Sequence, residues 1–203
     1  MDKSALFKIS YGLYALSAAE NGADNACIID AFSQVTSVDP IICVANVNKE
    51  NRTHDMILNT KRFNLSVLTK DTPFAFFERF GLQSGKNVNK FENYTHLQRA
   101  ENGLLFFTRH TNAHMAFEVT GTMDFGTHTL FSAQLTDSAV LNNHESVTYE
   151  YYREHIKPKA QTEKKGWTCT VCGYFYEGED LPHDYLCPLC KAAASAFELR
   201  LKD

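Results

Sequence analysis

Alternating stretches of apolar and polar residues predict β-strands in the first quarter of the chain. An apolar run over 14–19 is followed by Asn21-Gly22, a dipeptide typical of a two-residue turn between antiparallel strands. A second run covers 27–37, Asp39-Pro40 interrupts the pattern, and a third run covers 41–47. Strands joined by connections this short favour an antiparallel sheet over alternating strands and helices.

Two short helices are predicted after these strands. A polar stretch precedes a helical pattern that continues to Thr60, and either Asn51 or Thr53 can serve as its N-cap. A second, compact helix is expected over 73–80, with Gly81 ending it. Both helices are short enough to act as connections within a β-rich domain.

The remaining strands complete the expected fold of the first 160 residues. An apolar run over 63–68 predicts one strand, and 115–141 predicts two long strands with a turn near Gly126. The intervening segment 82–103 is polar and irregular, a long connection of the kind that often borders a site. A β-rich domain of this size is typical of a barrel.

Four cysteines near the end of the chain form two Cys-x-x-Cys pairs. They are Cys169, Cys172, Cys187 and Cys190, with 14 residues between the pairs. Four thiolates in this pattern can surround one tetrahedral ion, and thiolate ligands suit zinc or iron. The sequence therefore predicts a metal site in a small C-terminal domain.

The residues around these cysteines resemble rubredoxin between 166 and 199. The first pair is followed by Gly173, which permits a tight turn at positive φ, and aromatic residues flank both pairs. These aromatic residues are Trp167, Tyr174, Tyr176 and Phe197. The resemblance implies one iron held by the four thiolates, whereas a structural zinc ribbon is the alternative. Lys191 departs from the pattern, because rubredoxins usually have glycine there.

Composition limits the remaining possibilities. The chain has 203 residues with 44% hydrophobic and 12% aromatic content, as expected of folded domains rather than disorder. The net charge of −4 disfavours a nucleic-acid surface. With no basic leader and no membrane-length apolar run, a cytoplasmic protein is expected. Cys27 and Cys43 lie in apolar strands, where we expect buried, inert thiols.

A second group of polar residues predicts an anion site in the first domain. The end of one strand offers the amide and hydroxyl groups of Gln34, Thr36 and Ser37, and a helix start about a dozen residues later offers Lys49, Asn51, Arg52, Thr53 and His54. Cations and N–H groups at a helix start are suited to binding a phosphate. The alternative is a capped surface helix with solvated charges.

Several segments resemble the flavin reductase-like, FMN-binding split-barrel family. They are 34–40, 47–54, 63–68, 126–131 and 148–159, within a match of roughly 4–160 that follows the family's order. The resemblance implies a mainly β fold, an FMN-binding split β-barrel with a few short helices, and a homodimer.

The same resemblance assigns roles to individual residues. It implies that Gln34, Val35, Thr36 and Ser37 face the flavin ring and ribityl chain of a non-covalently held FMN. It implies that Asn48, Lys49, Asn51, Arg52, Thr53 and His54 surround the phosphate. His128 lies on a matched strand, either lining the flavin or nicotinamide side or serving as a hydrogen-bonded strand histidine.

We therefore expect a flavin domain over 1–156, a charged linker over 157–165 and a rubredoxin-like domain over 166–203. This combination resembles the high-molecular-weight rubredoxins of anaerobic bacteria. The resemblance implies hydride transfer from NAD(P)H to FMN, then single-electron transfer through Fe(Cys)4 to a flavodiiron protein or a rubrerythrin. One alternative is a flavin reductase with a structural zinc ribbon, and another is a passive carrier reduced by a separate reductase. The choice between NADH and NADPH stays open, and no catalytic side chain is expected.

Overall fold

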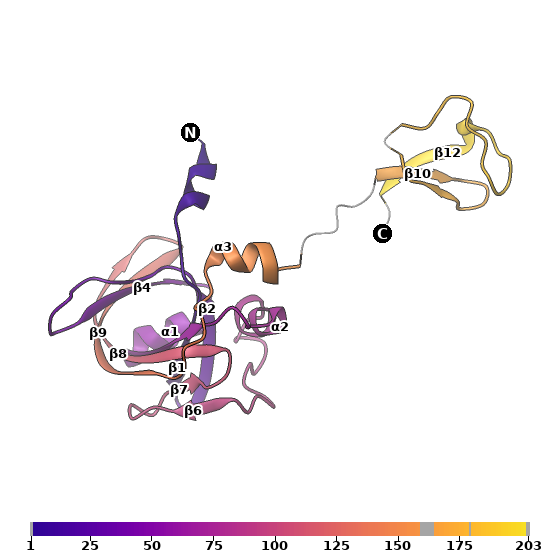
Figure 1. The fold of residues 1–203 in the computed structure, drawn as a ribbon. Helices are drawn as coiled ribbons and strands as arrows, with labels where there is room; N and C mark the ends of the chain where they lie inside the picture. Colours follow the sequence, from indigo (N-terminus) through magenta and orange to yellow (C-terminus); the bar gives the residue numbers. More distant parts are fainter. Residues whose placement is uncertain (1, 159–164, 179, 202–203) are drawn as a thin grey trace. The chain divides into compact units, whose positions relative to one another are not determined.

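Strands dominate the computed structural model, in agreement with the mainly β prediction. The structure describes residues 2–158, 165–178 and 180–201. The chain divides into two units, residues 1–158 and 159–203, which are described separately (Figure 1). The central part of the predicted linker 157–165 lies outside the described residues.

Unit 1 is built on a seven-stranded sheet whose hydrogen-bonded neighbours are all antiparallel. The strand order is β2-β1-β5-β8-β9-β4-β3. The strands are β1 (Tyr14–Glu20), β2 (Ala23–Ile29), β3 (Phe32–Gln34), β4 (Ile42–Asn48), β5 (Arg62–Leu68), β8 (Thr111–Asp124) and β9 (His128–Val140). A small second sheet pairs β6 (Leu97–Arg99) with β7 (Leu105–Phe107).

The predicted turn between the first two strands is confirmed. Asn21 and Gly22 have φ values of 51° and 78°, the left-handed conformation that a two-residue hairpin turn requires of both central residues. Because the turn fixes the register, Glu20 pairs with Ala23 and Tyr14 with Ile29. The cost of positive φ is low for glycine and tolerable for asparagine, which explains the choice of this dipeptide.

Short helices connect the strands. They are η1 (Lys3–Lys8), α1 (Arg52–Thr60), α2 (Phe74–Phe77) with its π-helical continuation η2 (Glu78–Leu82), and α3 (Tyr149–Tyr151) with η3 (Tyr152–Ile156). The N-cap of α1 is Asn51, whereas Thr53 lies inside the helix. The prediction that Gly81 ends its helix is wrong, because Gly81 lies within η2. A Cβ atom there would come within 3.2 Å of Ile28 Cγ1, so this glycine permits close packing on β2.

Two apolar clusters stabilise unit 1. In the first, α1 inserts Met56 and Ile57 among the strands that curve around it (Figure 1), and Phe63 stacks on Phe117 with ring centroids 5.0 Å apart. In the second, aromatic residues of α2 and η2 pack on Phe107. Burying an aromatic side chain contributes about 1.5–3 kcal/mol, so these rings supply much of the stability.

The predicted irregular connection 82–103 is tied firmly to the second cluster. Lys90 lies within it and is only 3% exposed. Its ammonium donates hydrogen bonds to the carbonyl oxygens of Ala26 and Phe80, at 3.0 and 2.9 Å. Because a buried cation needs such partners, this contact fixes the connection against β2.

Unit 2 is a small sheet around the cysteines. Its strands are β10 (Lys165–Cys169), β11 (Phe175–Tyr176) and β12 (Phe197–Leu201), in the order β11-β10-β12, with the short helix η4 (Ala194–Ala196). Cys169, Cys187 and Phe197 form its buried centre. A core of this size requires an additional cross-link such as a metal to hold the unit folded.

The two cysteines outside the cluster are buried, as expected. Cys27 is 1% exposed and Cys43 is 4% exposed. Burial raises the pKa of the Cys27 thiol to about 11, because the apolar surroundings disfavour the thiolate. Across the described residues, no helix combines the length and hydropathy needed to span a membrane.

Candidate metal centre and flavin site

The two Cys-x-x-Cys segments fold as a symmetric pair of turns. The first turn is closed by Gly173 N–H donating to Cys169 O at 2.9 Å, and the second by Lys191 N–H donating to Cys187 O at 2.9 Å. The residues that close the turns share a left-handed conformation, with φ of 77° at Gly173 and 61° at Lys191. The departure noted in the sequence therefore places a lysine where the turn favours glycine.

These turns bring all four thiols together. The Sγ atoms of Cys169, Cys172, Cys187 and Cys190 lie within 4.8 Å of one another. Two of the separations are 3.6 Å, from Cys169 to Cys190, and 3.5 Å, from Cys172 to Cys187. A metal–sulfur bond of about 2.3 Å in a tetrahedron requires sulfurs about 3.8 Å apart. The four cysteines thus fit one thiolate-bound ion.

Backbone N–H groups stabilise the thiolate form in part of this cluster. Burial raises the pKa of Cys187, but N–H groups of Cys190 and Leu189 outweigh it and lower the value to about 7. At Cys172 the Tyr174 N–H lowers the pKa, but burial and the neighbouring thiols raise it to about 12. Metal binding must therefore displace protons from part of the cluster.

Aromatic residues enclose the buried side of the centre. The rings of Tyr176 and Tyr185 lie 4.7 Å apart, and Tyr185 meets the Phe197 ring edge-on at 5.5 Å. Cys169 and Cys187 are buried against this layer, whereas Cys172 and Cys190 are exposed. Tyr185 is not among the aromatic residues predicted to surround the centre, although its place two positions before the second Cys-x-x-Cys pair was a usable signal.

The first predicted flavin segment, 34–37, leaves the end of β3. The backbone N–H groups of Val35 and Thr36 donate to Ile42 O at 2.8 and 3.2 Å, and the Thr36 hydroxyl accepts from Ile42 N–H at 2.7 Å. Gln34 donates to Thr36 O at 2.7 Å. The segment is thus fixed beside the start of β4, while Gln34, Val35 and Ser37 stay exposed.

The second predicted segment, 48–54, lies at the opposite end of β4. This strand has seven residues, so its two ends are about 20 Å apart. One ligand can contact both segments only if it is elongated and lies along β3 and β4. A flavin with a ribityl phosphate chain has that shape.

The side chains of the second segment point in different directions. The Lys49 ammonium is paired with Asp124 and holds the pKa of that carboxyl below its usual range. Thr53 accepts a hydrogen bond from Asn25 at 2.9 Å, and His54 bonds through its two ring nitrogens to Asp55 and Thr129, both at 2.9 Å. Thr53 and His54 are almost fully buried, so their side chains brace the start of α1.

Three predicted residues converge on one cavity of about 390 Å³. Asn48, Asn51 and His128 line it together with Tyr149, Tyr152 and Lys157. Asn48 pairs with His128 in the β4–β9 register, which explains why positions 80 residues apart meet. The volume falls within the usual range of ligand sites. The mixture of tyrosine rings, amides and a cation is suited to holding part of a flavin.

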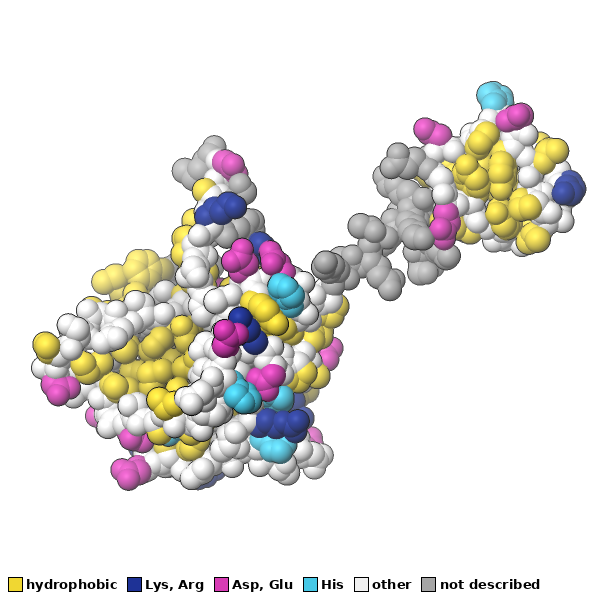
Figure 2. All heavy atoms as spheres, in the orientation of Figure 1, with side chains coloured by type: hydrophobic (Ala, Val, Ile, Leu, Met, Phe, Trp, Pro, Cys, Tyr) yellow, Lys and Arg dark blue, Asp and Glu magenta, His cyan; other side chains and the backbone are white. Residues whose placement is uncertain are grey.

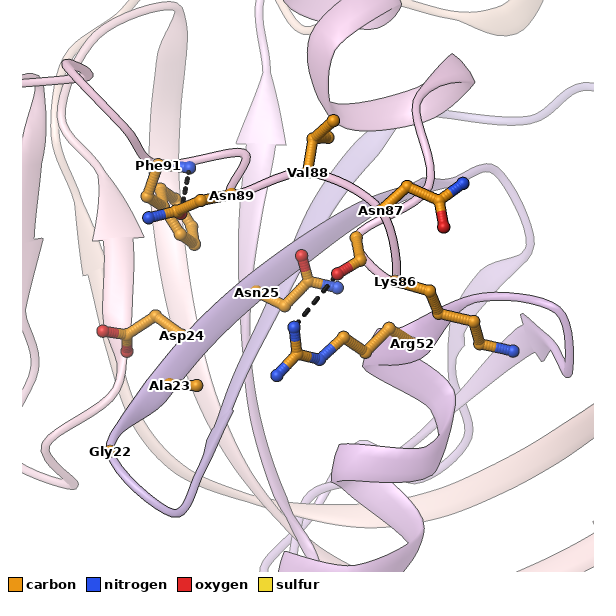
Figure 3. A pocket seen from close by; sticks show the side chains of 11 residues that line it. Gly22, Ala23, Asp24, Asn25, Arg52, Lys86, Asn87, Val88, Asn89 and Phe91 are labelled. Carbon is orange, nitrogen blue, oxygen red and sulfur yellow. Dashed lines mark hydrogen bonds between the residues drawn. The ribbon is translucent and has the colours of Figure 1, made fainter.

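Arg52 does not share this cavity. Its Nη1 atom donates to Gly85 O at 3.0 Å, and its guanidinium lines a separate cavity beside the turn between β1 and β2 (Figure 3). The sequence placed Arg52 beside Asn51 in one group because the two are adjacent. Asn51 is the N-cap and has an extended backbone with ψ of 128°, whereas Arg52 begins the helix, so the two adjacent side chains leave the chain in different directions.

Comparison with known proteins identifies the two units. Residues 6–160 match the flavin reductase like domain, more than half of the chain. The chain belongs to the flavin reductase-like domain family. Residues 167–198 match the rubrerythrin, rubredoxin-like domain. A rubredoxin-like metal centre therefore follows the flavin reductase-like domain in one polypeptide.

Three similar proteins support this assignment. The high molecular weight rubredoxin of Moorella thermoacetica is 32% identical, covering 98% of this chain and 99% of that protein. The ferric-chelate reductase (NAD(P)H) of Archaeoglobus fulgidus is 35% identical, covering 84% of this chain and 97% of that protein. The solved FMN-binding protein of Thermus thermophilus has a TM-score of 0.58 at 18% identity, covering 66% of this chain and 72% of its own. The expected domain combination is thus confirmed.

Proposed function

We propose that the protein is an electron-transfer flavo-rubredoxin. It accepts hydride from NAD(P)H on FMN and passes single electrons through Fe(Cys)4 to a redox protein, as those bound groups allow. The partner has the chemistry of a flavodiiron oxygen or nitric oxide reductase or a rubrerythrin. The observation that carries this proposal is a flavin reductase-like domain joined to a four-thiol cluster of metal-binding geometry.

The proposed FMN lies along β3 and β4. Gln34, Val35, Thr36 and Ser37 contact its ring and ribityl chain, supported by their hydrogen bonds to the start of β4. Of the proposed phosphate set Asn48, Lys49, Asn51, Arg52, Thr53 and His54, the two residues Asn48 and Asn51 line the cavity together with His128. Asn48, Asn51 and His128 contact the ligand, while the bonded side chains of Thr53 and His54 hold α1 in position.

We propose the domain boundaries that the sequence predicts: the flavin domain over 1–156, the linker over 157–165 and the rubredoxin-like domain over 166–203. No general acid or nucleophile of this chain is required, because hydride and electron transfer need positioning and exclusion of water. The protein is proposed to act in the cytoplasm.

The flavin domain is proposed to form a homodimer. Four large apolar side chains near strand ends are exposed: Val35 by 60% and Val38 by 72% in the connection between β3 and β4, Met123 by 58% near the end of β8, and Phe125 by 60% in the turn that follows β8. Figure 2 shows hydrophobic side chains gathered on a hollowed face of this unit. Exposed apolar groups of this extent favour a protein interface. Light scattering should give twice the mass of the chain, and a monomer would refute this proposal.

An anaerobic titration with NADH, repeated with NADPH and followed by visible absorption, tests the function. Bleaching of both the flavin and the ferric-thiolate bands is expected. Flavin bands without iron-thiolate absorption would identify a flavin reductase with a zinc ribbon. Both bands present but unchanged by either nucleotide would leave a passive carrier reduced by another enzyme.

A second function, reduction of ferric chelates, is favoured by the Archaeoglobus fulgidus relative. Steady-state reduction of a ferric chelate by the full-length protein and by a variant with Cys169 and Cys187 replaced by serine distinguishes the two. Equal rates would show that electrons leave directly from the flavin domain. A large loss in the variant would assign the reaction to the metal centre.

A further inference from the structure

The exposed side of the metal centre carries aliphatic side chains. Val171 in the first Cys-x-x-Cys turn is 67% exposed, and Leu189 at the equivalent position of the second turn is 70% exposed. Each comes directly before an exposed thiol, Cys172 or Cys190. Figure 2 shows hydrophobic side chains gathered on the visible face of unit 2. An electron acceptor that approaches the exposed thiols therefore meets these aliphatic groups.

One lysine adjoins this exposed side. Within the two turns, 169–173 and 187–191, Lys191 is the only residue besides the cysteines that can carry a charge. It follows Cys190 directly, and consecutive Cα atoms are about 3.8 Å apart, so its ammonium stays near the centre. Lys191 is exposed, and in the described parts of the chain no carboxylate lies within ion-pair distance of it. Its charge is thus available to a partner.

The backbone at Lys191 is in a conformation that a lysine disfavours. Its φ is 61°, and the equivalent residue of the first turn is Gly173, with φ of 77°. Non-glycine residues held in this conformation are concentrated at functional sites. Because glycine closes the first turn with the same hydrogen bond, the turn itself does not require a lysine. The strain therefore points to a use for the side chain.

A cation is useful at this position because the proposed centre is anionic. Four thiolates outnumber the positive charges of one iron ion in both of its oxidation states, and the excess is larger in the reduced state. Such a centre repels an acidic surface, and a neighbouring ammonium offsets part of that repulsion.

We propose that Lys191 makes the exposed side of the metal centre selective for electron acceptors with an acidic contact surface. The partner is a redox protein whose apolar patch packs on Val171 and Leu189 while its carboxylates approach Lys191. Charge complementarity of this kind raises the rate of association more than the affinity. The inference rests on the proposed function, because it requires iron at the four thiols. In each transfer the ferrous centre loses one electron and becomes ferric, and the acceptor gains that electron.

The test uses the full-length protein, loaded with iron and reduced with dithionite. The return of the ferric-thiolate absorption is followed by stopped flow, at wavelengths beyond the flavin band. Two acceptors of opposite charge serve as probes, the trivalent anion ferricyanide and the trivalent cation hexaammineruthenium(III). The measured quantity is the ratio of their second-order rate constants, because a change in reduction potential or iron content alters both rates in the same direction.

Three variants isolate the charge. Lys191→Gln removes it but keeps a long side chain on the same backbone, and Lys191→Arg retains it. Lys70→Gln removes an equal charge from unit 1, where this lysine pairs with Glu145.

The expected effect follows from Coulomb's law. At an ionic strength of about 10 mM, one charge about 10 Å from a trivalent ion changes the encounter rate by about fourfold. Lys191→Gln should slow ferricyanide and accelerate the ruthenium complex, so the ratio should fall by about tenfold. Lys191→Arg and Lys70→Gln should leave the ratio unchanged. At about 1 M salt the effect of Lys191→Gln should vanish, because the Debye length shrinks to about 3 Å.

Poly-L-glutamate is the probe for an acidic polypeptide surface. At low salt it should slow the reaction of the wild-type protein with ferricyanide and leave that of Lys191→Gln unaffected. An unchanged probe ratio in Lys191→Gln, an equal fall in Lys70→Gln, or equal inhibition of both proteins by poly-L-glutamate would overturn the proposal. Because the protein is loaded with iron and reduced chemically, a failure of NAD(P)H to reduce it, or zinc in the protein as isolated, would refute the proposed function alone.

Discussion

Replacing Lys191 with glycine should stabilise unit 2. Lys191 and Gly173 occupy equivalent positions in the two turns, with matching hydrogen bonds and φ values of 61° and 77°. A residue with a Cβ atom loses about 1–2 kcal/mol in this conformation. Glycine removes that strain but gives the unfolded chain extra freedom worth about 0.5–1 kcal/mol. The net gain expected for Lys191→Gly is about 0.5–1 kcal/mol.

Gly173→Ala is the matched control with the opposite sign, because it introduces the strain that Lys191→Gly removes. Trp167, the only tryptophan of the chain, lies in unit 2 and reports its unfolding by fluorescence. In zinc-loaded full-length protein at fixed free zinc, a slope of about 1 kcal/mol/M predicts urea midpoints shifted by about 0.5–1 M, upward for Lys191→Gly and downward for Gly173→Ala. An unchanged or lower midpoint for Lys191→Gly would refute the argument from backbone strain.

Four further outcomes are expected. Metal removal by a chelator should unfold unit 2 but leave the circular dichroism of unit 1 intact, and a cooperative loss of both signals would contradict the division into units. Metal affinity should fall as pH falls from 8 to 6, because the Cys187 and Cys172 thiols, with pKa values of about 7 and about 12, must lose their protons on binding. A competition titration that shows no pH dependence would contradict this. Shortening Lys157–Lys165 should slow iron reduction without changing flavin reduction, and equal stopped-flow rates would count against a linker role. In a denaturant titration, Phe117→Ala should lower the free energy of unfolding of unit 1 by about 3–5 kcal/mol, because Phe117 is fully buried. Phe125→Ala, at an exposed position, should change the free energy of unfolding of the monomer by less than about 0.5 kcal/mol.

Local sequence signals predicted the features that depend on neighbouring residues. Asn21-Gly22 identified its hairpin because the required φ values select those residue types. The spacing of the cysteines identified the cluster because each Cys-x-x-Cys pair forms one turn. In both cases each turn is determined by four or five consecutive residues.

Features that depend on distant contacts could not be read in this way. Lys90 belongs to a segment predicted only as a polar, irregular connection, but its side chain is buried and donates to two carbonyl oxygens of other segments. Gly81 looked like a helix stop, but its small size serves packing on Ile28. Arg52 was grouped with Asn51, but Asn51 is an extended N-cap residue and Arg52 is helical, and their side chains line separate cavities.

The number of residues in strand β4 is itself constrained. Its seven residues separate segment 34–37 from the start of α1, and its register with β9 joins Asn48 to His128. Inserting one residue would lengthen that interval by about 3.3 Å and turn the following side chains to the opposite face of the sheet. If the proposed flavin spans both segments, the length of this strand is under two constraints at once, the reach of that ligand and the alternation of core and surface. Relatives that keep the cofactor should vary freely in the loops around β4 and show no insertion or deletion within it.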